Sequence, residues 1–339
     1  MNNIYKIIFF TTLISGTLIS ISSSSWLGTW MGLEINLISF VPLISNSKNL
    51  FSSESAMKYF LVQALASTSF LFSIILLMIL NSLNEFSLTN WSLITILNSS
   101  LYLKMGAAPL HFWFPEVMSK LNWSQSMILL TWQKIAPMML LTYTMSNNIF
   151  SYLIIISSVC VGSIIGLNQT MMQKLMAYSS INHIGWMLAS MLFMENIWLI
   201  YFTIYSSVTI LLVLLMKNLN IFFLKQLFIN MNNSSLKFSF IINFLSLGGL
   251  PPFLGFLPKW IIIQNMINES MFMLTFIMIM MTMITLFFYL RVTFSILLIN
   301  YNENNWKPNL KFKNKKFIFF LNMISLSGLV MSTIIINMI

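Results

Sequence analysis

The sequence predicts an all-α polytopic membrane protein with eleven transmembrane helices, arranged as two inverted five-helix repeats plus one extra C-terminal helix. Three observations carry this prediction. Of 339 residues, 58% are hydrophobic and only 7% are charged, whereas a soluble domain carries about 25% charged residues. Apolar runs of about 20 residues, long enough to cross a bilayer as a helix, recur along the chain. A pattern of glycine and proline occurs twice, in two of these runs.

Each span is placed where an apolar run is long enough to cross about 30 Å of hydrocarbon. The spans cover residues 4–22, 26–45, 57–80, 91–115, 123–145, 149–168, 172–193, 196–216, 238–268, 271–298 and 317–338. Lys6 ahead of the first run is also typical of a signal peptide. However, no A-x-A cleavage site follows, and ISSSSW leads directly into the next run. We therefore interpret residues 4–22 as a span, with a signal peptide as the alternative.

Basic residues gather on one side of this predicted topology. Of the 17 Lys and Arg, fourteen lie on one side of the membrane, in the N-terminal segment, in the loops that follow spans 2, 4, 6, 8 and 10, or towards the adjoining span ends; the remaining three lie in the interior of spans. Because basic loops stay on the cytoplasmic or matrix side, the N-terminus is predicted there and the C-terminus on the far side. The basic run at 307–316 is interpreted as a topology anchor that touches anionic lipid or a partner, and a nucleic-acid role is not expected.

Four charged residues lie in the interior of predicted spans and are not assigned to either side: Glu34 in span 2, Lys104 in span 4, Lys134 in span 5 and Lys259 in span 9. A charge at mid-membrane costs about 2.5–3.5 kcal/mol or more, so each is a candidate functional residue. Burial disfavours the charged form of a lysine, and a nearby carboxylate favours it. A Glu34–Lys104 pair that opens and closes would therefore act as a protonation switch. The alternative is a static ion pair that only orients helices.

The repeated pattern G-x-x-P-x5-P occurs in MGAAPLHFWFP at 105–115 and again in GGLPPFLGFLP at 248–258. The residues that match or adjoin it are Gly106, Pro109, Pro115, Gly249, Pro251, Pro252 and Pro258. The two segments lie five spans apart, so they cross the membrane in opposite directions. Two spans interrupted by Gly and Pro at corresponding places are typical of the inverted repeats of transporters. Ordinary proline kinks are the alternative.

This repeat predicts the organisation of the chain. A first five-helix repeat is expected at 1–145, a second, inverted repeat at 149–298, and a basic loop with a C-terminal helix at 299–339. The helices of spans 4 and 9 should be discontinuous at the glycines and prolines.

Two histidines are candidate proton relays because imidazole titrates near pH 6.5. His111 lies between the prolines of span 4, and His183 lies in AYSSINHIGWML. A hydrogen-bonded core histidine is the alternative for each. The single Cys160 allows no disulfide framework. No GxGxxG, Walker, CxxC or HExxH motif is present, so neither a cofactor nor a metal site is expected in this chain.

Several stretches resemble the antiporter-like membrane subunits of respiratory complex I, in the mitochondrially encoded form of animals. They are WMGLEIN at 30–36, LKMGAAPLHFWFPEVM at 103–118, TWQKIAP at 131–137, KLMAYSSINHIGWM at 174–187 and NFLSLGGLPPFLGFLPKW at 243–260. The resemblance covers nearly the whole chain, and the stretches taken together are specific for this family.

The resemblance implies proton translocation along a buried axis. Glu34 and Lys104 correspond to an interacting pair, Lys134 to a lysine that bridges the two halves, and Lys259 to the terminal residue of the second half. His183 corresponds to part of the hydrated axis.

The resemblance also implies a setting. The location is the mitochondrial inner membrane, and the partners are neighbouring membrane-arm subunits and lipids such as cardiolipin. NADH, FMN, iron–sulfur clusters and ubiquinone would bind in other subunits. Two other functions stay open: a standalone cation/proton antiporter, and a scaffold subunit that does not pump.

Overall fold

A computed structural model describes residues 4–46, 49–82, 88–193, 195–230 and 234–298. Within these ranges the regular structure is helical, apart from one isolated antiparallel bridge between Met171 and Phe223. The chain divides into two compact units, Met1–Ile154 and Ile155–Ile339. The helices are α1 Ile4–Ser22, α2 Trp26–Ile44, α3 Leu50–Ser82, α4 Leu88–Met105, α5 Trp113–Lys120, α6 Trp123–Leu130, α7 Trp132–Thr144, α8 Ile149–Gly166, α9 Met172–Met191, α10 Glu195–Leu219, α11 Leu224–Asn230, α12 Ser234–Gly248, α13 Phe256–Asn268 and α14 Phe272–Leu298.

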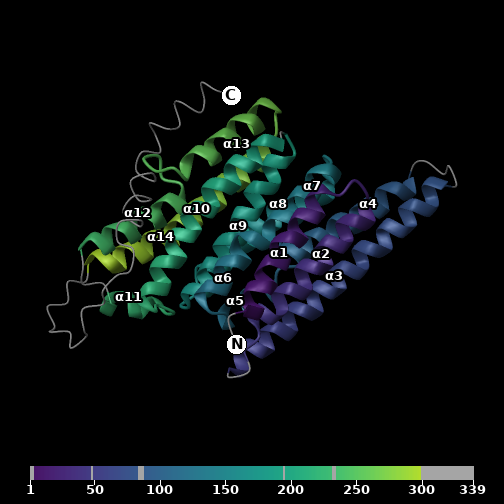
Figure 1. The fold of residues 1–339 in the computed structure, drawn as a ribbon. Helices are drawn as coiled ribbons and strands as arrows, with labels where there is room; N and C mark the ends of the chain where they lie inside the picture. The colour runs from purple at the N-terminus through teal and green to yellow at the C-terminus, as the bar shows by residue number, and fades with distance from the viewer. Residues whose placement is uncertain (1–3, 47–48, 83–87, 194, 231–233, 299–339) are drawn as a thin grey trace. The chain divides into compact units, whose positions relative to one another are not determined.

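The first unit is built around the long helix α3. Helices α2, α4 and α5 pack on α3, while α1 lies along α2, and α7 packs on both α1 and α4 (Figure 1). Phe40 of α2, Phe70 of α3 and Leu101 of α4 are fully buried where these helices meet. Helix α5 therefore rests against α3, and this contact positions the segment that follows the interruption near the end of the fourth predicted span.

The second unit is organised around α9 and α10. Helix α10 packs on α9, α12 and α13, and α14 packs on α11, α12 and α13 (Figure 1). Helix α9 is buried over nearly its whole length, including its polar residues Ser179, Ser180, Asn182 and His183. Polar groups in such a position need hydrogen-bond partners inside the protein, since neither water nor lipid headgroups reach them.

Helices lie at the predicted spans from 4–22 to 271–298. The last predicted span at 317–338, the basic run at 307–316 and the predicted C-terminal part at 299–339 lie outside the described residues. By length and composition, six described helices could each cross a membrane: α1, α2, α3, α8, α10 and α14. The total of eleven crossings and the two repeats stay predictions.

Three local features differ from the prediction. Helix α3 begins at Leu50 rather than at 57, because the Asn49 side chain accepts a hydrogen bond from the Phe51 N–H and so caps the polar turn SSES. The short helix α11 follows span 8 and was not predicted. Span 5 is interrupted at Thr131, whose hydroxyl donates to the Met127 carbonyl at 2.8 Å, a contact that bends helices.

Candidate functional site

The first interruption begins where α4 ends at Met105. Gly106 has φ +76°, a backbone conformation that glycine adopts readily. Its N–H donates to the Leu103 carbonyl at 3.2 Å, and the Ala107 N–H donates to the Tyr102 carbonyl at 3.0 Å. These two bonds form a Schellman motif, which satisfies carbonyls left without partners at a helix end. The fourth span is therefore discontinuous, as predicted from its glycine and prolines.

Lys104 lies in the last turn of α4, directly before this interruption. Its ammonium group lies 5.7 Å from the centre of the Phe70 ring, within range of a cation–π contact. Its carbonyl accepts a hydrogen bond from the Gln63 amide at 3.2 Å. Glu34 of α2 is half-buried, and it does not form a direct ion pair with Lys104 in the structure. The predicted pair is therefore open in this structure.

His111 lies in the connection between α4 and α5. Its side chain is 3% exposed, its Nδ1 lies 3.2 Å from the Pro109 carbonyl oxygen, and its ring packs on Phe112 at 4.5 Å between centres. Pro109 follows a cis peptide bond. Pro115 is the third residue of α5, where a helix needs no backbone N–H because the first turn has no carbonyl to donate to. The predicted relay His111 therefore lies buried inside the interruption.

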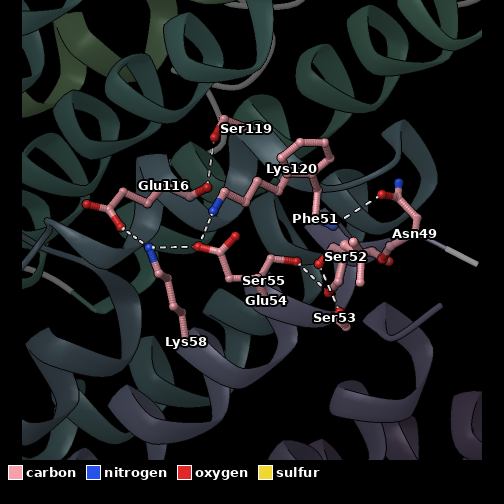
Figure 2. Close-up of polar contacts among 11 residues, drawn as sticks. Asn49, Phe51, Ser52, Ser53, Glu54, Ser55, Lys58, Glu116, Ser119 and Lys120 are labelled. Carbon is pink, nitrogen blue, oxygen red and sulfur yellow. Dashed lines mark hydrogen bonds and ion pairs between the residues drawn. The ribbon is translucent and has the colours of Figure 1, made fainter. Parts of the chain in front are cut away.

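Four charged side chains fasten α5 to α3, as Figure 2 shows. Lys58 Nζ lies 3.3 Å from a Glu54 carboxylate oxygen and 3.0 Å from a Glu116 oxygen, and Lys120 also pairs with Glu54. All four side chains are partly exposed, and a pair of this kind contributes about 0–1 kcal/mol. The sorting of basic residues assigns Lys58 and Lys120 to the same side of the membrane, but the sequence did not predict that the two segments meet.

Lys134 lies in the first turn of α7, three residues after the Thr131 interruption. The side chain is 1% exposed, and its Nζ lies 5.6 Å from the centre of the Phe114 ring of α5. Of the three predicted lysines it is the most deeply buried, since Lys104 is 8% exposed and Lys259 is 5% exposed. An ammonium group in such surroundings is costly to keep charged, which is the property expected of a titrating group.

A polar chain beside Lys134 was missed by the sequence analysis. The Gln133 amide donates to the Asn36 side-chain oxygen at 2.9 Å, and the Tyr59 hydroxyl donates to the Gln133 oxygen at 3.4 Å. These residues come from α7, α2 and α3. The available signal was an uncharged amide inside each of WMGLEIN and TWQKIAP, since buried amides need partners.

The second interruption begins where α12 ends at Gly248. Gly249 has φ +81°. Its N–H donates to the Ser246 carbonyl at 3.0 Å, and the Leu250 N–H donates to the Leu245 carbonyl at 3.3 Å, again a Schellman motif. Pro251 and Pro252 follow in an exposed turn, and α13 then begins. The ninth span is therefore also discontinuous, as predicted.

Lys259 crosses this second interruption. Its ammonium donates to the Gly248 carbonyl at 2.9 Å and to the Leu247 carbonyl at 3.5 Å, so it binds the free carbonyls at the end of α12. It also lies 5.9 Å from the centre of the Trp186 ring of α9. A Cβ atom at Gly249 would lie 2.9 Å from the lysine side chain, so the glycine also makes room for it.

The two interruptions coincide in register. Adding 143 to the last residue of α4, Met105, gives Gly248, the last residue of α12. The same offset carries Trp113, the first residue of α5, onto Phe256, the first residue of α13. It also carries Pro115 onto Pro258, each the third residue of its helix. Two segments of different sequence thus have the same helix ends, the same glycine conformation and the same hydrogen-bond motif.

His183 lies next to the second interruption. Its Nδ1 lies 2.8 Å from the Tyr201 hydroxyl, and its ring centre lies 5.0 Å from that of Tyr205. His183, Ser246 and Pro258 line one small cavity of about 10 Å³, which is roughly the space that one water molecule needs. Tyr201 was not predicted, because a tyrosine in an apolar span gives no signal of its partner.

The arrangement consists of side chains that can each take up and release a proton. Within the first unit it gathers a half-buried carboxylate, two buried lysines and a buried histidine around an interrupted helix. Within the second unit it places a buried lysine and a histidine at another. In the described part of the chain, no group of three or more His, Cys, Asp or Glu side chains could hold a metal ion.

Comparison with known proteins finds relatives of nearly the whole chain. Residues 23–285 match the family model described as NADH:quinone oxidoreductase/Mrp antiporter, transmembrane, and residues 286–336 match NADH dehydrogenase subunit 2 C-terminus. The chain is 50% identical to NADH-ubiquinone oxidoreductase chain 2 of Anopheles gambiae and 51% identical to that of Aedes aegypti. In both comparisons the match covers 99% of each protein.

The fold is that of a solved relative. A chain of respiratory complex I from Thermus thermophilus superposes with a TM-score of 0.85 at 22% identity, over 97% of this chain and 79% of that one. The animal relatives match over nearly their full length, and the family model covers both interruptions. The chain therefore belongs to the family of NADH-ubiquinone oxidoreductase chain 2 proteins.

Proposed function

We propose that this chain is a membrane-arm subunit of respiratory complex I that translocates protons across the mitochondrial inner membrane. NADH oxidation and ubiquinone reduction take place in other subunits, which hold NADH, FMN, iron–sulfur clusters and ubiquinone. The observation that carries the proposal is the pairing of a buried lysine with each interruption, Lys104 at the end of α4 and Lys259 across the gap between α12 and α13. Charged groups and open backbone at membrane depth are tolerated where they serve transport.

The proton moves along an axis formed by Glu34, Lys104, Lys134 and Lys259, with His111 and His183 as relays. Approach of Glu34 favours the ammonium form of Lys104, and withdrawal favours release of its proton. At an effective dielectric constant of about 20, a charge pair 4 Å apart is stabilised by about 4 kcal/mol relative to complete separation. Moving one charge against 100 mV needs about 2.3 kcal/mol. Complete separation of such a pair therefore changes the energy by more than the step needs.

The two halves act as inverted five-helix repeats, 1–145 and 149–298. The coincidence of helix ends, glycine conformations and proline positions at the two interruptions supports this organisation. The N-terminus faces the matrix and the C-terminus faces the intermembrane space. The ion pairs of Glu54 and Lys58 with Glu116 and Lys120 support one part of this topology, namely that the segments after spans 2 and 4 share one side; the choice of the matrix for that side rests on the sorting of basic residues. Neighbouring subunits and anionic lipids such as cardiolipin surround the chain.

The test is Lys104→Ala in the assembled complex, reconstituted into vesicles. We expect the complex to assemble and to oxidise NADH, with fewer protons moved per electron pair. Lys217→Ala is the matched control, since Lys217 is an exposed lysine in the last turn of α10 and should leave the ratio unchanged. An unchanged proton-to-electron ratio in Lys104→Ala would overturn the proposal.

The two alternative functions predict different results. A scaffold that does not pump predicts impaired assembly with a normal ratio in whatever complex forms. A standalone cation/proton antiporter predicts ion exchange by the chain reconstituted alone. Glu34 is the single carboxylate inside the predicted spans, and three buried lysines would repel a cation.

A further inference from the structure

We propose that Gln63 and Trp113 are positioning residues for Lys104. Their side chains donate hydrogen bonds to the last carbonyls of α4, and these bonds keep the Lys104 ammonium from binding the end of its own helix. The ammonium therefore stays available for proton exchange. The inference rests on the proposed function, in which Lys104 takes up and releases a proton.

Three kinds of donor occupy the carbonyls at the end of α4. The Tyr102 and Leu103 carbonyls accept the backbone N–H groups of the Schellman motif. The indole Nε1 of Trp113, the first residue of α5, also donates to the Leu103 carbonyl at 3.1 Å. The Gln63 amide of α3 donates to the Lys104 carbonyl at 3.2 Å. Both of these side chains are buried, so helices α3 and α5 complete the end of α4 with uncharged donors.

The second interruption shows the alternative arrangement. There the Lys259 ammonium donates to the Gly248 and Leu247 carbonyls. The offset of 143 that aligns the two interruptions carries Lys104 onto Leu247, so the Gln63 amide occupies a carbonyl that corresponds to one bound by a lysine. A lysine close to a helix C-terminus can bind the last carbonyls in this way. At the first interruption an amide and an indole take these places instead.

Helix α3 holds the two ends of Lys104 at separate points. The carbonyl of Lys104 accepts from Gln63, while its ammonium lies 5.7 Å from the centre of the Phe70 ring. Gln63 and Phe70 are seven residues apart, so they share one face of α3 and are separated by about 10 Å along it. The ammonium is thus held on an aromatic ring while an amide fills the carbonyl.

The contacts of an ammonium decide how readily it releases its proton, and hydrogen bonds to carbonyls stabilise the charged form. The ionisable residues on the described elements around Lys104 are Glu34 on α2, Glu54, Lys58 and Tyr59 on α3, Tyr102 on α4, His111 in the connection, Glu116 and Lys120 on α5, and Lys134 and Tyr143 on α7. In the described part of the chain, none of them forms an ion pair or a hydrogen bond with the Lys104 ammonium. Because the carbonyls of α4 are occupied, the charge of Lys104 can respond to the approach and withdrawal of Glu34.

The first arm of the test is a density map of the assembled complex with the double variant Gln63→Met/Trp113→Phe. These substitutions keep most of the side-chain volume and remove both donors. The inference predicts that the Lys104 ammonium turns to lie within hydrogen-bond distance of a carbonyl in the last turn of α4. An ammonium that stays on the Phe70 ring would contradict the inference.

The second arm measures the proton-to-electron ratio in vesicles as a function of pH. Carbonyls that bind the Lys104 ammonium oppose proton release, so the pH at which the ratio reaches half its maximum should rise by about one unit in the double variant. Trp91→Phe is the matched control, since Trp91 is an exposed indole in the first turn of the same helix, and it should leave the profile unchanged. If the double variant assembles poorly, Gln63→Met alone should shift the profile in the same direction. A lower ratio with an unshifted profile would show a purely structural role and refute the inference.

Failure of this inference can be told from failure of the proposed function. If Lys104→Ala lowers the ratio but the double variant has the wild-type pH profile, the inference alone is overturned. If Lys104→Ala keeps the full ratio, the proposed function is overturned, and the inference with it.

Discussion

Lys259 combines two properties that are normally separate in a membrane protein. Its ammonium donates to the Gly248 carbonyl at the end of α12, which is a structural role, and the proposed function also requires this buried group to release a proton. Substitutions can separate these properties, because arginine keeps the charge and the donors but cannot be deprotonated in a protein. Lys104 does not allow the same comparison, because its ammonium contacts the Phe70 ring rather than a backbone carbonyl.

We predict that Lys259→Arg assembles with near-normal stability and yet moves fewer protons per electron pair. Lys259→Met should also move fewer protons per electron pair. In addition, it should lower the stability by about 1 kcal/mol, the usual contribution of one hydrogen bond. The measurements are the proton-to-electron ratio in vesicles and the melting temperature of the purified complex. Full pumping by Lys259→Arg would show that the charge acts statically.

At the residue scale, the sequence predicted the charged members of the site but not their uncharged partners. Lysines and glutamates inside apolar spans are conspicuous because of their transfer cost. Gln133, Asn36 and Tyr59 are tolerated in any span, and their hydrogen bonds depend on how α2, α3 and α7 pack. Only the tertiary structure reveals that Gln63 binds the Lys104 carbonyl.

The helices themselves are interrupted by backbone conformation. At both interruptions a glycine with positive φ closes a Schellman motif, and this feature is local enough to be read from G-x-x-P. Span 5 is interrupted at Thr131 without such a pattern. The hydrogen bond from the Thr131 hydroxyl to the Met127 carbonyl could not be predicted from the sequence. Glycine and proline patterns therefore predict two of the three interruptions in the predicted spans of the described part.

We predict opposite effects for alanine at two adjacent glycines. Gly249→Ala forces a Cβ into a left-handed conformation at a cost of roughly 1–2 kcal/mol and places it 2.9 Å from the Lys259 side chain. Gly248→Ala adds a Cβ to a helical residue with no atom nearer than 3.5 Å and should be neutral or slightly stabilising.

Thermal melting of the complex and the proton-to-electron ratio are the readouts for this pair. Gly249→Ala should lower the melting temperature and also the proton-to-electron ratio, since it displaces Lys259. Gly248→Ala should lower neither quantity. Equal melting temperatures for the two variants would show that the positive φ at Gly249 is not required.

For the molecule as a whole, the predicted topology rests on the sorting of basic residues. We predict that a membrane-impermeant maleimide labels Glu269→Cys in mitochondria whose outer membrane has been removed. Lys217→Cys should react only after the inner membrane is opened, because it lies on the predicted matrix side. Both side chains are exposed, and the wild type, which has Cys160 alone, gives the background. The reverse pattern of labelling would invert the topology.

The whole-molecule organisation is the level at which sequence and structure agree least completely. Composition alone established a helical membrane protein, since 7% charged residues cannot cover a soluble surface. Only six described helices are long and apolar enough to count as spans by themselves, because interruptions divide some spans and buried polar residues such as His183 lower the hydropathy of α9. The interruptions and the buried polar residues that make these spans hard to recognise are also the features of the candidate site.

The most direct test of the central claim compares Lys104→Ala, Lys259→Ala and the double variant in reconstituted complex I. If both lysines serve one proton path, each single variant should lower the proton-to-electron ratio by the same amount, and the double variant should lower it no further, because groups that act as a unit are not additive. If the double variant loses twice as much as either single variant, or if one single variant keeps the full ratio, the two interruptions do not form one path.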